Sequence, residues 1–254
     1  MQTFLKYLII IILPLEFLKA SVFINQAGYL SNLSKIFYTE TFTDSFYVIE
    51  ASTGNIAFKD GLFFSVSNDP ATGLTLYGGE FSSLETNGSY FIRLSNGDSS
   101  FIFSISPNVF DDPFKKALKG YYFQRCGTTL LQTNAGVYYH ASCHPADGFY
   151  HSSTGQSGFR LTTGGWHDAG DYGKYVVNSG ITVGTLLLAY ENFPEKFSRD
   201  DLNNPESGNG IPDLLDEVRY EIEWLLKMQN SNGGIYFKIT KEQFESFIMP
   251  QNDS

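Results

Sequence analysis

The chain has 254 residues, of which 42% are hydrophobic and 17% charged, and it carries a formal net charge of −10. This is the composition of a globular protein, and the length allows one large domain or two ordinary ones. The acidic balance argues against nucleic acid and anionic membranes as partners, because binding to phosphate groups requires Lys and Arg. The net charge does not exclude neutral ligands such as sugars.

Residues 1–20 predict a secretory signal peptide. Lys6 precedes an apolar run over residues 7–13, and Ala20 and Ser21 are small residues at a suitable cleavage point. The run is about half of the ~20 residues that a membrane-spanning helix needs. The alternative is an uncleaved membrane anchor. We expect a secreted, extracellular and monomeric protein that has no membrane partner after cleavage.

Residues 21–106 predict an immunoglobulin-like β-sandwich. In the last of seven short apolar runs, Phe101, Phe103 and Ile105 fall on one face, and Ser104 falls on the other. This period of two residues is typical of a half-buried strand. Seven such strands with turn residues between them favour a sandwich. The runs cover residues 22–24, 35–38, 46–49, 56–58, 74–77, 90–94 and 101–105.

From about residue 107 the pattern becomes helical. Asp111, Asp112 and Pro113 predict a cap and first turn ahead of a helix over residues 114–123. A long irregular stretch follows over residues 125–171, and such stretches in compact domains usually serve function.

Two further helices are predicted, over residues 175–191 and from Pro212 onward. In the later one, apolar residues recur at steps of three and four, so we expect its stripe to pack on other helices. Residues 235–254 show no pattern that closes a fold. The stripe consists of Ile211, Leu214, Leu215, Val218, Ile222, Leu225 and Leu226.

Asp168 and Asp171 are candidate catalytic carboxylates. They lie three residues apart in a glycine-flanked loop, between Trp166 and Tyr172. One carboxylate can deprotonate water, while the other orients that water or raises its neighbour's basicity. The aromatic faces of Trp166 and Tyr172 are candidates for binding sugar rings. A polar surface turn or a calcium loop is the alternative explanation of this pattern.

Two cysteines and two histidines form a candidate metal site. Cys126, Cys143, His144 and His167 offer two thiolates and two imidazoles, which suit a closed tetrahedral zinc site. Their spacings are not those of a zinc finger. In a secreted protein, a Cys126–Cys143 disulfide is the alternative that the residues alone favour.

Oxygen donors crowd the start of the last helix. Glu206, Asn209, Asp213 and Asp216 could bind calcium through carboxylates and carbonyls. The alternative is capping, in which acidic side chains complement the helix dipole, and the residues alone favour it.

The stretch GGWHDAGDYGKY at residues 164–175 closely resembles the N-terminal catalytic motif of glycoside hydrolase family 9, whose members are mainly endo-β-1,4-glucanases, or cellulases. The resemblance extends to residues 121–127, 140–144 and 208–217. Residues 22–29 resemble the opening strand of the immunoglobulin-like module that precedes some of these catalytic domains. Together these segments span nearly the whole mature chain.

The resemblance implies an (α/α)6 toroid that hydrolyses β-1,4-glucosidic bonds of cellulose or related β-glucans with inversion. It assigns the general base to Asp171, and to Asp168 a role in holding the attacking water. It also assigns zinc to the four Cys and His residues, which reverses the preference for a disulfide. Calcium sites occur in the family as well.

The family's general acid is a Glu near the end of a much longer catalytic domain, and no Glu of this sequence matches it. We therefore expect a multidomain β + α protein in which residues 107–254 are the N-terminal part of an incomplete toroid. The chain alone is expected to release no reducing ends from soluble β-glucan. The alternative is a non-catalytic, secreted carbohydrate-binding protein or a decayed fragment.

Overall fold

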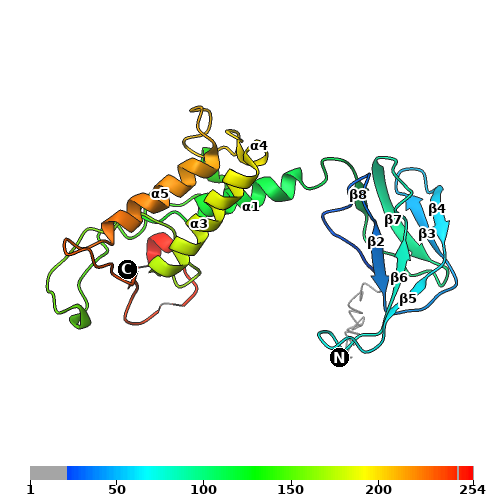
Figure 1. Ribbon diagram of the computed structural model, residues 1–254, viewed down its shortest axis with the longest axis horizontal. Helices are drawn as coiled ribbons and strands as arrows, with labels where there is room; N and C mark the ends of the chain where they lie inside the picture. The colour runs from blue at the N-terminus through cyan, green and yellow to red at the C-terminus, as the bar shows by residue number, and fades with distance from the viewer. Residues whose placement is uncertain (1–21, 245, 254) are drawn as a thin grey trace, which may run out of the picture. The chain divides into compact units, whose positions relative to one another are not determined.

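The computed structural model describes residues 22–244 and 246–253, and the chain divides into two compact units between Asp111 and Asp112 (Figure 1). The predicted signal peptide lies outside the described residues. In the part of the chain that is described, no helix is long and apolar enough to cross a membrane.

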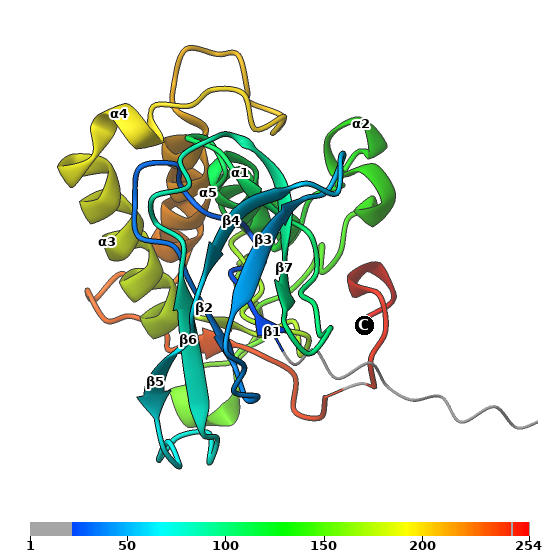
Figure 2. The ribbon, with the colours of Figure 1, turned by 90° about the vertical axis from the view of Figure 1, so that its right-hand side faces the viewer.

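The first unit is a β-sandwich of two four-stranded antiparallel sheets, which confirms the predicted architecture (Figure 2). Both sheets draw strands from early and late parts of the unit, so neither can form from a single hairpin. One sheet has the order β1 (Val22–Phe23), β2 (Ile36–Thr39), β6 (Leu76–Glu80) and β5 (Phe63–Val66), and the other has the order β4 (Ile56–Asp60), β3 (Phe46–Glu50), β7 (Gly88–Leu94) and β8 (Phe103–Ile105).

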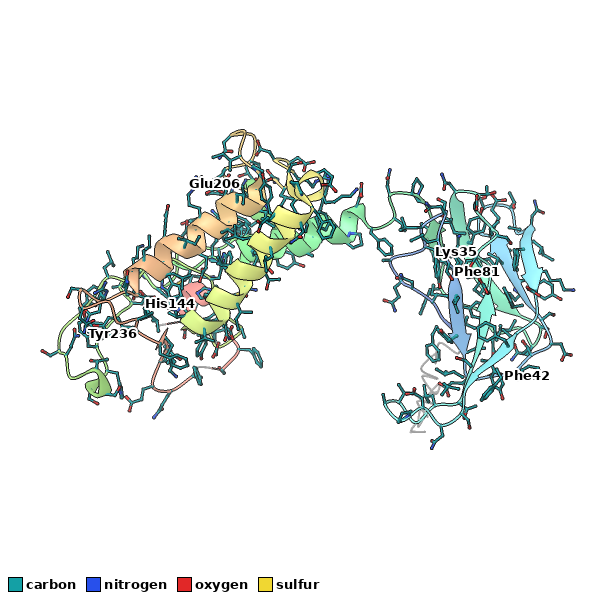
Figure 3. All side chains as sticks on the ribbon, viewed as in Figure 1. Lys35, Phe42, Phe81, His144, Glu206 and Tyr236 are labelled. Carbon is teal, nitrogen blue, oxygen red and sulfur yellow. The ribbon has the colours of Figure 1, made fainter. Side chains whose placement is uncertain are left out.

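Aromatic side chains fill the space between the two sheets (Figure 3). The rings of Phe37 on β2 and Phe46 on β3 meet edge to face, with their centroids 4.8 Å apart. Phe81 is fully buried and packs against Tyr29 at 5.1 Å and Phe103 at 5.6 Å. Edge-to-face pairs add to the stabilisation that apolar burial provides.

Phe81→Ala is expected to destabilise the sandwich by about 3–5 kcal/mol, because it leaves a cavity among the rings that Phe81 contacts. Amide hydrogen exchange of β7 in the whole chain measures this loss as faster exchange. Phe42→Ala is the matched control, since the Phe42 side chain is 55% exposed. Equal exchange in the two variants would contradict the assignment of Phe81 to the core.

The structure adds one strand and lengthens another. β5 was absent from the sequence prediction, and β6 runs on to Glu80, beyond the predicted 74–77. Two glycines hid this extension, because glycine usually weakens a strand. Here the missing side chain makes room for a ring: a Cβ on Gly79 would lie 2.2 Å from the ring of Phe37.

The prediction that Phe101 shares a buried face with Phe103 and Ile105 is wrong. Phe101 is 65% exposed and precedes β8, which begins at Phe103. The ladder between β7 and β8 ends at the pair Tyr90–Phe103, so the alternation of faces does not extend back to Phe101.

The second unit contains three longer helices, and α3 lies beside α5 (Figure 1). α1 begins three residues before the predicted start, and the predicted irregular stretch contains a short helix, α2, and two 3-10 turns. A two-stranded antiparallel ladder, β9–β10, was not predicted. The elements are α1 (Asp111–Phe123), α2 (Gln132–Ala135), η1 (Gly136–Tyr138), η2 (Ser152–Thr154), β9 (Lys174–Tyr175), α3 (Val176–Asn192), α4 (Pro194–Phe197), α5 (Asp213–Lys227), β10 (Lys238–Ile239) and η3 (Pro250–Asn252).

Helix α5 does not bury the whole apolar stripe that its sequence shows. Leu214 and Val218 are buried, but Ile222 and Leu226 are 36% and 64% exposed, so among the described residues the stripe packs on other helices only in part. The helix instead buries a neighbouring face that carries polar groups. The buried residues of that face are Glu217, Glu221 and Trp224.

Candidate active site and metal centre

The two candidate carboxylates lie in a loop closed by one backbone hydrogen bond, from the N–H of Asp168 to the carbonyl of Gly173 at 2.8 Å. Asp168 is exposed, and the Asn178 side-chain amide donates to it at 2.7 Å. Asp171 is half-buried and accepts hydrogen bonds from the Tyr175 hydroxyl at 3.0 Å and from the Gly173 N–H at 3.2 Å. Each carboxylate is thus held by its neighbours and remains open to solvent.

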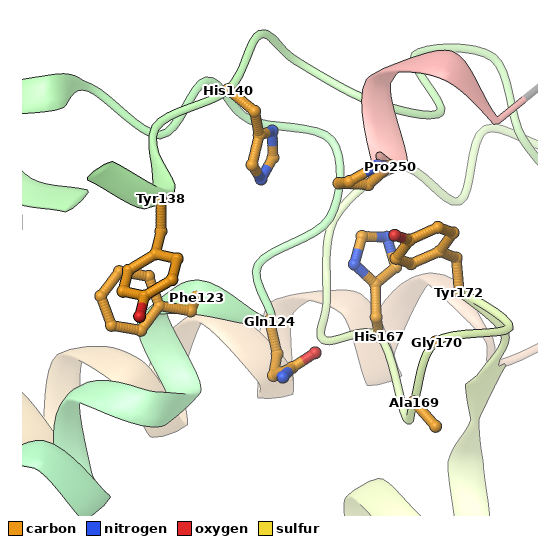
Figure 4. A pocket seen from close by; sticks show the side chains of 9 residues that line it. All are labelled: Phe123, Gln124, Tyr138, His140, His167, Ala169, Gly170, Tyr172 and Pro250. Carbon is orange, nitrogen blue, oxygen red and sulfur yellow. The ribbon is translucent and has the colours of Figure 1, made fainter. Parts of the chain in front are cut away.

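Two cavities adjoin this loop. The smaller, of about 160 Å³, is lined by Asp168, Tyr175 and Asn178 among others. Figure 4 shows the larger, of about 410 Å³, with Phe123 and Tyr138 on one side and Tyr172 on the other. The larger cavity therefore offers aromatic walls beside the loop.

Cys126, Cys143, His144 and His167 are brought together in the second unit, with one ligand atom of each within 4.8 Å of the others. The Cys126 sulfur lies 3.7 Å from Nδ1 of His144, and the Cys143 sulfur lies 3.7 Å from Nε2 of His167. Both cysteines are buried and free, with no disulfide between them. The pKa of the Cys143 thiol is lowered, because the Cys126 thiol and both imidazoles hydrogen-bond to its sulfur. A thiolate is the form that binds a metal.

Asp253 supports this cluster, and sequence reasoning missed it. Its Oδ2 lies 3.0 Å from Nε2 of His144, and its other oxygen pairs with Lys241. A carboxylate on the outer nitrogen of a histidine fixes the ring's orientation and tautomer. Nothing in the sequence around Asp253 indicates this role, since 109 residues separate it from His144.

Trp166 and Tyr172 adjoin different cavities. Trp166 is only 6% exposed and packs against Tyr121 at 5.1 Å, yet it lines the smaller cavity together with Asp168, so a sugar contact by its ring stays a prediction. Tyr172 lines the larger cavity, and its ring meets that of His167 edge-on at 5.1 Å. Its hydroxyl donates to the carbonyl of Ile248. A substrate contact by Tyr172 stays a prediction.

The four candidate calcium ligands have protein partners instead of converging on one point. Within residues 22–244 and 246–253, the cluster of metal-ligand side chains is the Cys and His set, not this one. The two acids at the start of α5 lie where negative charge complements the helix dipole. The pairs are Glu206 with Arg125 at 2.9 Å, Asn209 with Asp216 at 2.9 Å, and Asp213 with the Ser207 hydroxyl and the Leu202 N–H at 2.6 and 2.7 Å. Because no described side chain forms a cap hydrogen bond at the start of α5, both the calcium and the capping explanations stay predictions.

Glu221 on α5 is a further titratable group of this region that sequence reasoning missed. Its side chain is fully buried, and it accepts the backbone N–H of Trp166 at 2.6 Å. Burial raises the pKa of Glu221 to about 7. Helical periodicity in α5 indicates which face packs inward. It does not indicate that an acidic residue such as Glu221 is buried there.

Glu221→Gln is expected to change how stability depends on pH. A carboxyl whose pKa is higher in the folded state stabilises the fold fully below the unfolded pKa, and this contribution is lost as pH rises toward 7. Between about pH 4.5 and 7 the free energy of unfolding should fall by up to about 3 kcal/mol more in the native protein than in the variant. Urea unfolding with excess chelator, followed by tryptophan fluorescence, measures the difference. Parallel pH profiles would contradict it.

The comparisons with known proteins agree with this geometry. The family model described as "Glycosyl hydrolase family 9" matches residues 110–253, and the model "Cellulase N-terminal ig-like domain" matches residues 18–99. Endoglucanase D of Acetivibrio thermocellus is 40% identical over 233 residues, which are 91% of this chain and 37% of that protein.

Solved structures show the same fold. A structure described as "Bacteroides ovatus GH9" superposes with a TM-score of 0.85 at 33% identity, covering 92% of this chain and 44% of that one. A Zn-binding triple mutant of the family 9 endoglucanase J30 superposes with a TM-score of 0.77 at 33% identity, covering 87% of this chain and 43% of that one. The chain thus spans about two fifths of the length of these relatives. With more than half of its residues matched by the family model, the chain belongs to glycosyl hydrolase family 9.

Proposed function

We propose that this chain supplies the water-activating half of a site that hydrolyses β-1,4-glucosidic bonds in cellulose or related β-glucans, with inversion at the anomeric carbon. The loop that holds Asp168 and Asp171 carries this proposal, because it presents two fixed, solvent-reaching carboxylates beside an aromatic cavity. Membership of the family and the similarity to endoglucanase D support the substrate class. A polymer of this kind is met outside the cell, and the apolar run at residues 7–13 supports secretion.

In the proposed mechanism, Asp171 is the general base. The Tyr175 hydroxyl and the Gly173 N–H hold its carboxylate, and its remaining lone pairs take a proton from water. Asp168, steadied by Asn178, orients that water. Inverting enzymes place acid and base about 6.5–9.5 Å apart, so that the water fits between base and sugar. No residue of this chain is assigned as the acid.

We propose zinc as the ion of the cluster formed by Cys126, Cys143, His144 and His167. Two sulfurs and two ring nitrogens, mostly buried and mutually close, match the ligand set that structural zinc prefers. These four side chains would hold the ion, which would cross-link the segments that carry them. His167 directly precedes Asp168, so a His167 side chain held in the cluster also fixes the start of the loop that carries the two carboxylates.

Hydrolysis of β-cellobiosyl fluoride by the predicted mature chain, residues 21–254, tests the proposed function. Fluoride leaves without being protonated, so its release depends on water activation and not on the general acid. We expect fluoride release well above the spontaneous rate, with the α-anomer of cellobiose as first product. Release at the spontaneous rate, or first formation of the β-anomer, would overturn the proposal.

A further inference from the structure

One face of helix α5 carries polar groups toward the segments that contain two of the metal-cluster residues. Glu217, Tyr220, Glu221 and Trp224 follow one another at steps of three, one and three residues, so they share a face of the helix. Glu217 and Glu221 are 2% and 0% exposed. Burying carboxylates costs several kcal/mol each unless partners compensate, so their partners are informative.

Glu217 holds both members of a backbone bridge. Arg125 and Trp166 pair as an isolated antiparallel bridge. One oxygen of Glu217 accepts from the Arg125 guanidinium at 2.6 Å, and the other accepts from the indole N–H of Trp166 at 3.1 Å. A single carboxylate therefore sets the distance between two segments that lie far apart in the sequence.

The backbone bonds of the bridge place the neighbouring residues. The N–H of Cys126 donates to the carbonyl of Gly165 at 2.7 Å, and the N–H of His167 donates to that of Gln124 at 2.8 Å. The Tyr220 hydroxyl of α5 donates to the Cys126 carbonyl at 2.6 Å. Cys126 and His167 therefore each directly follow a residue whose side chain Glu217 contacts.

Glu221 and Trp224 fix the second segment from its backbone side. Glu221 accepts the N–H of Trp166 at 2.6 Å, so two groups of α5 hold this one tryptophan. Gly165 has a φ of 75° and rests on the indole of Trp224, where an added Cβ would lie 2.5 Å from the ring. Neither the backbone conformation nor the space there admits another residue without strain.

We propose that Glu217 and Glu221 are positioning residues that fix the metal cluster and the loop of residues 168–173 in place relative to each other. By holding Arg125 and Trp166, they place Cys126 and His167 and, one residue later, Asp168. The inference rests on the proposed function for its catalytic part. Neither glutamate belongs to the metal cluster or lines either cavity beside the loop of Asp168 and Asp171.

Zinc affinity of residues 21–254, measured by competition with a chelator, tests this role. Glu221→Leu removes the acceptor of the Trp166 N–H, and we expect affinity about 10-fold or more weaker, as for the loss of groups that orient metal ligands. Glu221→Gln keeps an acceptor oxygen and should stay within about 2-fold of the native affinity. Glu223→Leu, on the exposed side of α5, is the matched control. Native affinity in a folded Glu221→Leu variant would overturn the proposal.

Glu217→Gln covers the case in which Glu221→Leu does not fold. The amide keeps the shape of the side chain but cannot accept equally well from both Arg125 and Trp166. We expect the indole N–H signal of Trp166 to shift and the amides of Cys126 and His167 to exchange about 10-fold faster or more. Unchanged exchange at both amides would count against the proposal.

The two proposals can fail separately. Without fluoride release from the native chain, the catalytic proposal fails, while the zinc affinities and amide exchange still decide the positioning role. If the native chain releases fluoride, Glu221→Leu should lower kcat with KM within about 2-fold, because it displaces Asp168 without touching the substrate. A change in KM alone would contradict positioning.

Discussion

One zinc ion is expected to bind each mature chain, residues 21–254, and Cys126→Ser is expected to weaken that binding by more than about 100-fold. The serine hydroxyl does not ionise near neutral pH, so the variant loses one of two thiolates in a site whose ligand atoms lie within 4.8 Å of one another. Metal analysis after gel filtration and chelator competition measure the stoichiometry and the affinity. Thermal unfolding of the second unit should occur at a lower temperature in the variant.

His151→Ala is the matched control for this experiment. His151 is exposed and bonds locally to Ser153, so its loss should leave zinc binding unchanged. Mass spectrometry gives the contrary outcome directly: a Cys126–Cys143 disulfide in the native chain with no bound metal would refute the zinc proposal.

Asp171→Asn is expected to lower fluoride release from β-cellobiosyl fluoride by about 10²–10⁴-fold, because general base catalysis is worth that much. The amide keeps the size of the side chain and can still accept from Tyr175, so the loop should retain its shape. Asparagine cannot take a proton from water. The loss should therefore appear in kcat, with KM little changed.

Two variants bracket this result. Asp168→Asn should cost less, about 10–10²-fold, because it orients the water without accepting its proton. Glu223→Gln, on the exposed face of α5, should leave fluoride release unchanged.

Added azide, a small anion that can attack without a base, should restore turnover to Asp171→Asn. Equal rates in native protein and Asp171→Asn would remove Asp171 from the base's role.

Local patterns predicted the sandwich and the three longer helices, because strand alternation and helical spacing depend on near neighbours in the sequence. The errors come from contacts between distant residues. Gly79 belongs to a strand because the ring of Phe37 fills its side-chain space. Glu221 of α5 is buried where its carboxylate accepts the N–H of Trp166, a contact that the spacing of apolar residues in α5 does not indicate.

The candidate site divides in the same way. The motif at residues 164–175 pointed to Asp168 and Asp171. The two cysteines with His144 and His167 suggested a metal site by their chemistry, and the resemblance favoured zinc there over a disulfide. Asp253 was beyond prediction, because only folding brings it to His144. The partners of Trp166 were also beyond prediction, because they lie on α5, outside the motif.

The wide sequence separation of these contacts bears on the order in which the chain acquires structure during synthesis. Every residue of the sandwich core lies between Val22 and Ile105, so the ribosome completes that unit's core before α1 is made. Arg125 and Trp166, in contrast, wait for Glu217. Because domains generally fold in order of synthesis, the N-terminal unit folds first, while the cysteine thiols of the second unit stay accessible until α5 is made. Oxidation of these thiols therefore competes with metal binding during the time between synthesis of Cys126 and synthesis of Glu217.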